Sequence, residues 1–171
     1  WIIALDGNDE DNVVISEDSE FGNVEETLGS GGTDTYTASD GKKYTTVGMI
    51  NIPSINVNYP ILSKTTDSLL KVSVCKFWGS DPNQVGNLCI AGHNYRNKRF
   101  FSKVPTLTVG DIIEITDVNK KTLKYSVYDK YTVDPEDTSC TSQITNGKKI
   151  VTLITCTNDS KQRVIVKAEA I

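Results

Sequence analysis

The segment 150–168, IVTLITCTNDSKQRVIVKA, contains two β-branched runs separated by a short polar stretch. Valine, isoleucine and threonine favour strands, whereas residues 158–161 are of types that form turns. The pattern predicts a hairpin in which Cys156 ends the first strand and Arg163 begins the second. Because antiparallel strands pair position by position, the hairpin would bring these two side chains back beside one another.

Short runs of β-forming residues alternate with turn signals from residue 47 onward. Strands of about five residues at this spacing are typical of a β-sandwich or a β-barrel. Two short segments have helical character instead, one at 67–72 with Thr66 as a cap and one at 98–104 before Pro105. The sequence therefore predicts a mostly-β domain with one or two short helices. Its expected strands are 47–52, 55–62, 86–91, 111–116, 123–133, 150–155 and 163–168.

The N-terminal part of the chain differs in composition from the rest. Residues 1–41 contain 11 of the 22 acidic residues and no Lys or Arg, which leaves 18 basic and 11 acidic residues in 42–171. A polar, acidic segment of this kind buries too little apolar surface to offset its ordering entropy. We therefore predict a leader or linker over 1–45 and one folded domain over 46–171. The apolar start, WIIAL, is too short to cross a membrane, and fits either the stub of a trimmed membrane anchor or the start of a soluble segment.

The basic character of 42–171 leaves two interpretations open. It could attract an anionic partner, such as a wall polymer, a lipid headgroup or the acidic leader, or it could be an ordinary solvated surface. Nucleic acid is not expected as a partner, because the lysines are scattered and no nucleic-acid-binding motif accompanies them.

The four cysteines and the single histidine do not form a metal-binding pattern. A zinc site needs about four ligands at characteristic spacing, and no CxxC pair is present, so no metal is predicted. Cys89 lies in an apolar run and is expected to be a small buried hydrophobe, whereas Cys140 lies in a polar stretch and is expected on a loop. A disulfide between Cys75 and Cys140 is conceivable if the protein is exported.

Cys156, His93 and Arg163 are the residues that could carry chemistry. The flanking sequence places each one at the end of a different predicted strand, and a barrel can gather such positions into one site. A thiolate nucleophile, an imidazole that moves protons and a guanidinium that stabilises an oxyanion are the parts of a cysteine-dependent acyl transfer. Taken singly, each also has a plain structural explanation, as a core cysteine, a hydrogen-bonded histidine and a solvated arginine.

Taken together, these segments resemble the sortases, the cysteine transpeptidases of the Gram-positive cell envelope. Residues 152–156, TLITC, are similar to the TLxTC signature of that family. The order histidine, cysteine, arginine is preserved, and the resemblance covers residues 47–171. The other similar segments are AGHN at 91–94, RVIVKA at 163–168, FFSKV at 100–104, LTVGD at 107–111 and GMINIP at 48–53.

The resemblance implies a closed β-barrel of about eight strands with transpeptidase activity. Cys156 would attack the Thr–Gly carbonyl of an LPxTG-like sorting signal, giving a thioacyl intermediate that an amine then resolves. His93 would carry protons to and from the amines, and Arg163 would hold the substrate carbonyl and the oxyanion. This chemistry requires no metal or organic cofactor. The substrate-binding residues would be Thr155, Asn94 and Ile154.

The resemblance also implies partners and a location. The partners would be surface proteins with a C-terminal LPxTG-like signal and an amine acceptor, either a lipid-linked peptidoglycan precursor or a pilin lysine. The protein would act on the extracellular face of the cell membrane of a Gram-positive bacterium, attached by an N-terminal anchor that this chain does not include.

Two alternative functions remain open. Pilin-polymerising sortases carry an N-terminal lid with an aromatic residue after Asp-Pro, but Asp81-Pro82 is followed by Asn83 and the leader has no such motif. The connection 134–149 is too short for the long helix of members that anchor haem-uptake proteins, which favours a housekeeping-like or sporulation-associated subclass. The alternative from another class is a non-catalytic β-barrel wall-binding module without a reactive thiol.

Overall fold

The computed structural model of the chain describes residues 33–38, 41–94, 100–157 and 161–171. Within these residues the chain is mostly β, with one short α-helix, α2 (Asp67–Leu70), and three 3-10 turns. The turns are Pro53–Ile55, Val104–Thr106 and Ser139–Thr141. The strands are β1 (Asp34–Thr37), β2 (Lys43–Ile52), β3 (Val57–Leu62), β4 (Val74–Trp78), β5 (Gly86–Ala91), β6 (Ile112–Asp117), β7 (Thr122–Val133), β8 (Lys149–Cys156) and β9 (Arg163–Ala170).

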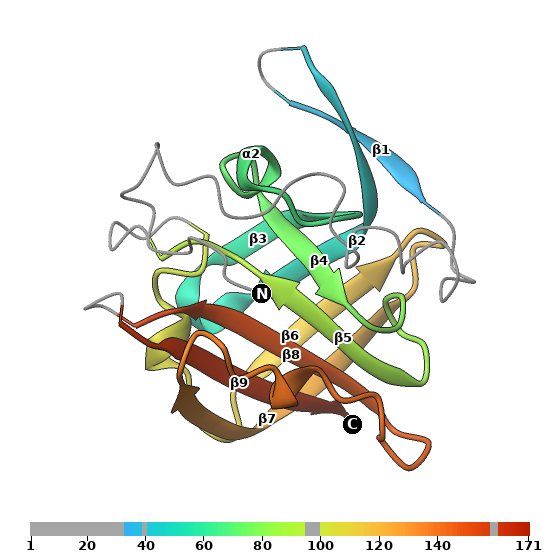
Figure 1. The fold of residues 1–171 in the computed structure, drawn as a ribbon. Coiled ribbons are helices and arrows are strands. Elements are labelled where there is room, and N and C mark those ends of the chain that lie inside the picture. The colour runs from blue at the N-terminus through green and yellow to red at the C-terminus, as the bar shows by residue number, and fades with distance from the viewer. Residues whose placement is uncertain (1–32, 39–40, 95–99, 158–160) are drawn as a thin grey trace.

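The strands form one sheet that closes on itself. Their order is β1-β2-β3-β4-β5-β8-β9-β7-β6, and β2 pairs with β6 in addition to β1 and β3. This pairing closes β2 to β9 into an eight-stranded barrel, while β1 and the first residues of β2 project from it as a two-stranded ribbon (Figure 1). The predicted closed β-barrel is therefore confirmed.

Three strands meet at one edge of the barrel. The pairing of β5 with β8 is parallel, so both strands end at the same edge. The pairing of β8 with β9 is antiparallel, so β9 begins there (Figure 1). This topology brings together the three chain segments in which the sequence analysis located chemistry.

The alternation of side chains along each strand divides the apolar residues into two clusters. The larger cluster fills the barrel interior and includes Val151 and Leu153 of β8. The second cluster includes Ile154 and Cys156 of the same strand, together with Leu70 from α2 and Cys140 from the turn Ser139–Thr141. Because successive strand residues point to opposite faces, this second cluster lies on the outer face of β8, under α2 and that turn.

Each of the seven strands predicted from the sequence is present, and two further strands were missed. One is β4, and the other is β1, whose four residues pair with Lys43–Thr46 of β2. Strand pairing therefore begins at Asp34, inside the segment predicted to be a linker. Of that segment, residues 1–32 and 39–40 lie outside the described residues.

Of the two predicted helices, one is confirmed. Helix α2 begins after Thr66, whose hydroxyl accepts a hydrogen bond from the Leu69 backbone N–H at 3.1 Å, as an N-cap should. The helix expected over 98–104 is wrong over its described part. Phe100 has a positive φ of 50° and pairs with Asn94 in an isolated β-bridge. Both features are incompatible with a continuing α-helix.

No membrane-spanning helix is found in the described part of the chain, since none of its helices has the length and apolar character needed to cross a bilayer.

Candidate active site

Cys156 and Arg163 form the centre of the candidate site. They are register partners in the antiparallel pair of β8 and β9, and Arg163 Nη1 donates a hydrogen bond to Cys156 Sγ at 3.2 Å. Both residues are buried, with 1% and 5% of their surface exposed, so water screens the contact only weakly. A guanidinium at this distance stabilises the thiolate relative to the thiol. The hairpin and the contact expected from the sequence are both present.

The parallel pairing of β5 and β8 brings His93 to the same edge of the sheet as these residues. Ala91, the last residue of β5, is the register partner of Ile154, and the Gly92 backbone N–H donates to the Ile154 carbonyl at 3.1 Å. His93 is two residues beyond Ala91 and Cys156 is two residues beyond Ile154, so both follow the same edge of the sheet. His93 is 3% exposed. An imidazole held in this position is suited to transferring protons at the thiol.

Phe101 holds the backbone of the histidine, and Phe100 fixes the same segment to Tyr59, a role that the sequence pattern did not reveal. The Phe101 backbone N–H donates to the His93 carbonyl at 3.0 Å, and the Phe100 backbone N–H donates to the Tyr59 hydroxyl at 2.9 Å. The ring of Phe101 lies against Gly92 so closely that a Cβ there would be 2.6 Å from Phe101 Cδ2. The signal in the sequence was the pairing of a glycine before the histidine with two consecutive aromatic residues after it.

The three residues expected to bind substrate all surround Cys156, but their side chains are buried. Ile154 is fully buried in the outer apolar cluster. Asn94 is also fully buried, and its side-chain amide donates a hydrogen bond to the Cys156 carbonyl oxygen at 2.9 Å. Thr155 is also fully buried, and in the described part of the chain its hydroxyl has no hydrogen-bond partner. Direct contact of these residues with a substrate stays a prediction.

The other three cysteines are buried free thiols, so the conceivable disulfide between Cys75 and Cys140 is not formed. Burial raises the pKa of Cys75 and of Cys89, and it also raises the pKa of Cys140 even though the nearby Lys167 opposes the effect. Cys89 is buried as predicted. Cys140 lies in the connection between β7 and β8, as predicted, in a 3-10 turn where its side chain is buried. These three thiols are therefore held in the unreactive protonated form.

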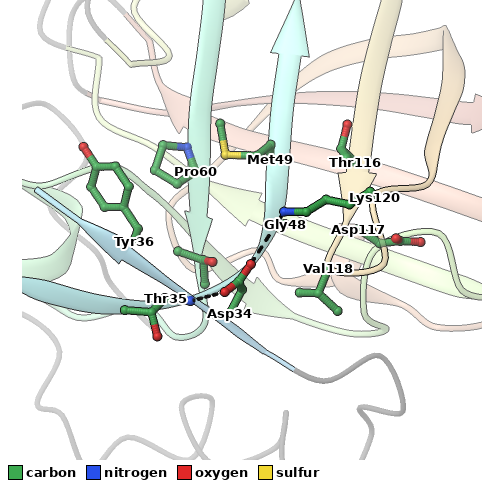
Figure 2. A pocket seen from close by; sticks show the side chains of 11 residues that line it. Asp34, Thr35, Tyr36, Gly48, Met49, Pro60, Thr116, Asp117, Val118 and Lys120 are labelled. Atoms are coloured by element: carbon green, nitrogen blue, oxygen red, sulfur yellow. Dashed lines mark hydrogen bonds and ion pairs between the residues drawn. The ribbon is translucent and has the colours of Figure 1, made fainter.

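A cavity of about 210 Å³ lies elsewhere on the molecule, between β1, β2 and the turn that joins β6 to β7. Figure 2 shows Asp34, Met49 and Lys120 around it, with Lys120 Nζ 3.7 Å from the Asp34 carboxylate. His93, Cys156 and Arg163 do not line it, so it is separate from the candidate site. Over the described ranges, no cluster of His, Cys, Asp and Glu side chains could hold a metal ion.

A closed β-barrel that brings a cysteine, a histidine and an arginine to one edge defines a β-barrel cysteine enzyme. A sequence model described as the sortase domain matches residues 50–171, which is more than half of the chain and includes all three residues. The chain belongs to the sortase family, whose members are cysteine transpeptidases.

Individual relatives agree with this assignment. Sortase A of Bacillus anthracis is 30% identical over 128 residues, covering 73% of this chain and 60% of that protein. The sortase D5 transpeptidase of Clostridium perfringens has a TM-score of 0.67 and 34% identity, covering 74% of this chain and 79% of that one. Sortase C2 of Group B Streptococcus Pilus Island 1 has a TM-score of 0.67 and 30% identity, covering 74% of each chain. The chain thus spans 60% of the length of the Bacillus anthracis relative.

Proposed function

We propose that this chain is the catalytic domain of a sortase that cleaves an LPxTG-like sorting signal and joins the released carbonyl to an amine. The observation that carries the proposal is the 3.2 Å contact between Arg163 Nη1 and Cys156 Sγ. Burying a guanidinium is unfavourable unless it is paired, and here the buried group faces a thiol. A wall-binding module without catalysis would gain nothing from this arrangement.

In the first half of the reaction, the Cys156 thiolate attacks the Thr–Gly carbonyl carbon and a C–S bond forms. The carbonyl oxygen becomes an oxyanion, which Arg163 stabilises with its N–H groups. His93, as an imidazolium, gives its proton to the departing glycine nitrogen, and the C–N bond breaks. The products are a thioacyl enzyme, a free amine and a neutral imidazole.

In the second half, the nitrogen of an acceptor amine attacks the thioester carbonyl. His93 takes the proton from that nitrogen, a new C–N bond forms, and the C–S bond breaks to regenerate the Cys156 thiolate. The thiolate and the imidazolium are restored together at the end of the cycle. The reaction is a transfer with no net redox change, and its balance needs no cofactor.

The surroundings of Cys156 support an apolar peptide as the donor substrate. Ala91, Ile154 and Ile165 belong to the same outer-face cluster as the thiol. An apolar side chain of the donor peptide, such as the leucine of an LPxTG-like signal, is compatible with these apolar surroundings of the thiol.

The subclass follows from the connection 134–148, which is fully described and contains only the 3-10 turn Ser139–Thr141. The absence of a long helix there counts against a member that anchors haem-uptake proteins. This leaves, as the first candidate, a housekeeping-like or sporulation-associated enzyme that is attached to the membrane of a Gram-positive cell and acts at its surface. A pilin-polymerising enzyme is the second candidate, favoured by the likeness to sortase C2 of a pilus island. The acceptor amine, a peptidoglycan-precursor amine or a pilin lysine, separates the two.

A panel of fluorogenic sorting-signal peptides tests the proposal, with each peptide offered together with a wall-type amine or a lysine-containing peptide. We expect cleavage of one motif with an acceptor-linked product, and no cleavage by Cys156→Ala. Cleavage that persists in Cys156→Ala would contradict the assignment of Cys156 as the nucleophile. A wild-type protein that cleaves nothing, and whose Cys156 is inert to alkylation, would instead favour the wall-binding module.

A further inference from the structure

Asn94 connects the histidine segment to the residue that carries the nucleophile. Its side chain is fully buried, and its Nδ2 donates a hydrogen bond to the backbone carbonyl of Cys156 at 2.9 Å. Asn94 directly follows His93 in the chain. One hydrogen bond therefore joins the neighbour of the imidazole to the backbone of the thiol.

This hydrogen bond extends the parallel ladder between β5 and β8 beyond the end of β5. The last backbone rung of that ladder runs from the Gly92 N–H to the Ile154 carbonyl, at 3.1 Å. In a parallel ladder the next acceptor along β8 is the carbonyl two residues further on, which is that of Cys156. The Asn94 amide occupies this acceptor, so the two segments stay tied although the regular pairing has ended.

The histidine segment is fixed on its other side by contacts that do not involve the nucleophile. The Phe101 N–H holds the His93 carbonyl, and Asn94 itself pairs with Phe100 in a β-bridge. These contacts orient His93 relative to the 100–101 segment. The Asn94 amide is the described side-chain contact that sets its position relative to Cys156.

We propose that Asn94 is a positioning residue, which keeps the His93 imidazole at a fixed position relative to the Cys156 thiol during proton transfer. The proposal rests on the transpeptidase function proposed above, and it differs from the role expected from the sequence. A fully buried amide that is already bound to the Cys156 carbonyl orients the catalytic pair, and its loss acts on the chemical step and not on peptide affinity.

Two substitutions test the proposal. Asn94→Ala removes the amide, and Asn94→Asp keeps the shape but turns an oxygen toward the Cys156 carbonyl in place of the donor. We expect both to lower kcat by about 10- to 100-fold, the scale of a small misplacement of catalytic groups. KM should stay within about twofold of wild type, because binding that is equal in ground and transition states is untouched. The alkylation rate of Cys156 by iodoacetamide should fall as well.

Asn87→Ala is the matched control. Asn87 is also a buried asparagine, within β5, and its Nδ2 donates to the backbone carbonyls of Cys140 at 2.8 Å and Ser142 at 3.1 Å. Its loss should lower the melting temperature but leave kcat unchanged below that temperature. An equal fall of kcat in Asn87→Ala would overturn the proposal, because general loosening would then explain the effect.

The remaining outcomes are also decisive. A raised KM with unchanged kcat in the Asn94 variants would assign Asn94 to substrate binding, and unchanged kcat and KM would leave it no role in positioning. If wild-type protein cleaves no peptide, the proposed function fails. Alkylation kinetics then decide the positioning role alone: slower alkylation in Asn94→Ala but not in Asn87→Ala supports it, and equal rates in all three proteins overturn it.

Discussion

Arg163 approaches the Cys156 sulfur to 3.2 Å from the first residue of the adjacent strand, so strand register alone brings the guanidinium to the thiol. The contact needs no loop to close, since β8 and β9 pair without interruption from Ile150 and Glu169 up to these two residues. The site is thus built on the barrel wall, where neighbouring strands limit how far either side chain can move.

The planar fork of Arg163 should matter as well as its charge. Arg163→Lys keeps a positive charge but loses the fork that can serve the thiolate and the oxyanion together. We expect kcat/KM to fall by about 10²- to 10³-fold, the loss typical of removing an oxyanion donor. Lys124→Gln removes a positive charge from an exposed position of β7 and is the control, with turnover expected to be unchanged. Near-normal turnover in Arg163→Lys would reduce the role of Arg163 to its charge.

Gly92 should tolerate no side chain. A Cβ at this position would lie 2.6 Å from Phe101 Cδ2 and 3.0 Å from Val74 Cγ1, so Gly92→Ala must displace the ring that accompanies the His93 anchor. We expect a loss of stability of about 1–3 kcal/mol in urea unfolding, together with reduced turnover. The double variant Gly92→Ala/Phe101→Leu should regain part of both, because the smaller side chain relieves the overlap. A Gly92→Ala protein as stable and active as wild type would show that the packing is looser than described.

The protein should become less stable in alkali because of its buried thiols. Unfolded, Cys75 and Cys89 titrate near 9.0, whereas burial raises the pKa of both in the folded protein. Above pH 9 the unfolded state therefore loses protons that the folded state keeps. The contribution of each buried thiol to the free energy of unfolding is therefore fully present below pH 9. Above pH 9 the free energy of unfolding falls by up to about 1.4 kcal/mol per pH unit for each thiol.

Urea midpoints between pH 7 and pH 11 measure this effect. Cys75→Ala should make the alkaline part of the profile less steep, since it removes one of the buried thiols whose pKa burial raises, whereas Cys156→Ala serves as the comparison. A Cys75→Ala profile parallel to wild type would contradict the assignment of the slope to that thiol.

The ion pair between Lys76 and Asp81 should be costly to break from one side. Lys76 Nζ lies 2.9 Å from Asp81 Oδ1, and the two side chains are 2% and 5% exposed. Lys76→Met leaves a buried carboxylate without this cation, which is expected to destabilise the fold by about 3–5 kcal/mol. Lys76→Met/Asp81→Asn should recover much of the loss, because the amide is neutral. A single variant that unfolds at the wild-type urea concentration would show that the pair contributes little.

The strands that the sequence predicted are those with a regular β-branched pattern, and the missed ones break that pattern for physical reasons. In β4, VCKFW, the charged Lys76 interrupts an apolar run, and only its buried partner Asp81 makes the position acceptable. In β1, DTYT, the residues are largely exposed, so the strand is held by its pairing with β2 and not by a buried face.

The candidate site also contains features that the sequence could predict and features that it could not. Strand ends and hairpin register could be predicted, which placed Cys156, His93 and Arg163 at one edge. The contact from Asn94 to the Cys156 carbonyl joins residues 62 positions apart and depends on where β5 ends, so local pattern gives no sign of it. The helix expected near Phe100 failed for a related reason, since the Phe100 and Phe101 contacts to Tyr59 and His93 override local helix propensity.

The central claim is that Cys156 forms a thioacyl bond with a sorting signal, and intact-protein mass spectrometry tests it most directly. The protein is mixed with a cleavable LPxTG-type peptide without an amine acceptor, quenched in acid and digested to locate the adduct. We expect a mass increase equal to the acyl half of the peptide, carried by Cys156 alone and removed when an amine is added. Peptide cleavage without any adduct on Cys156, or with the adduct on another residue, would contradict it.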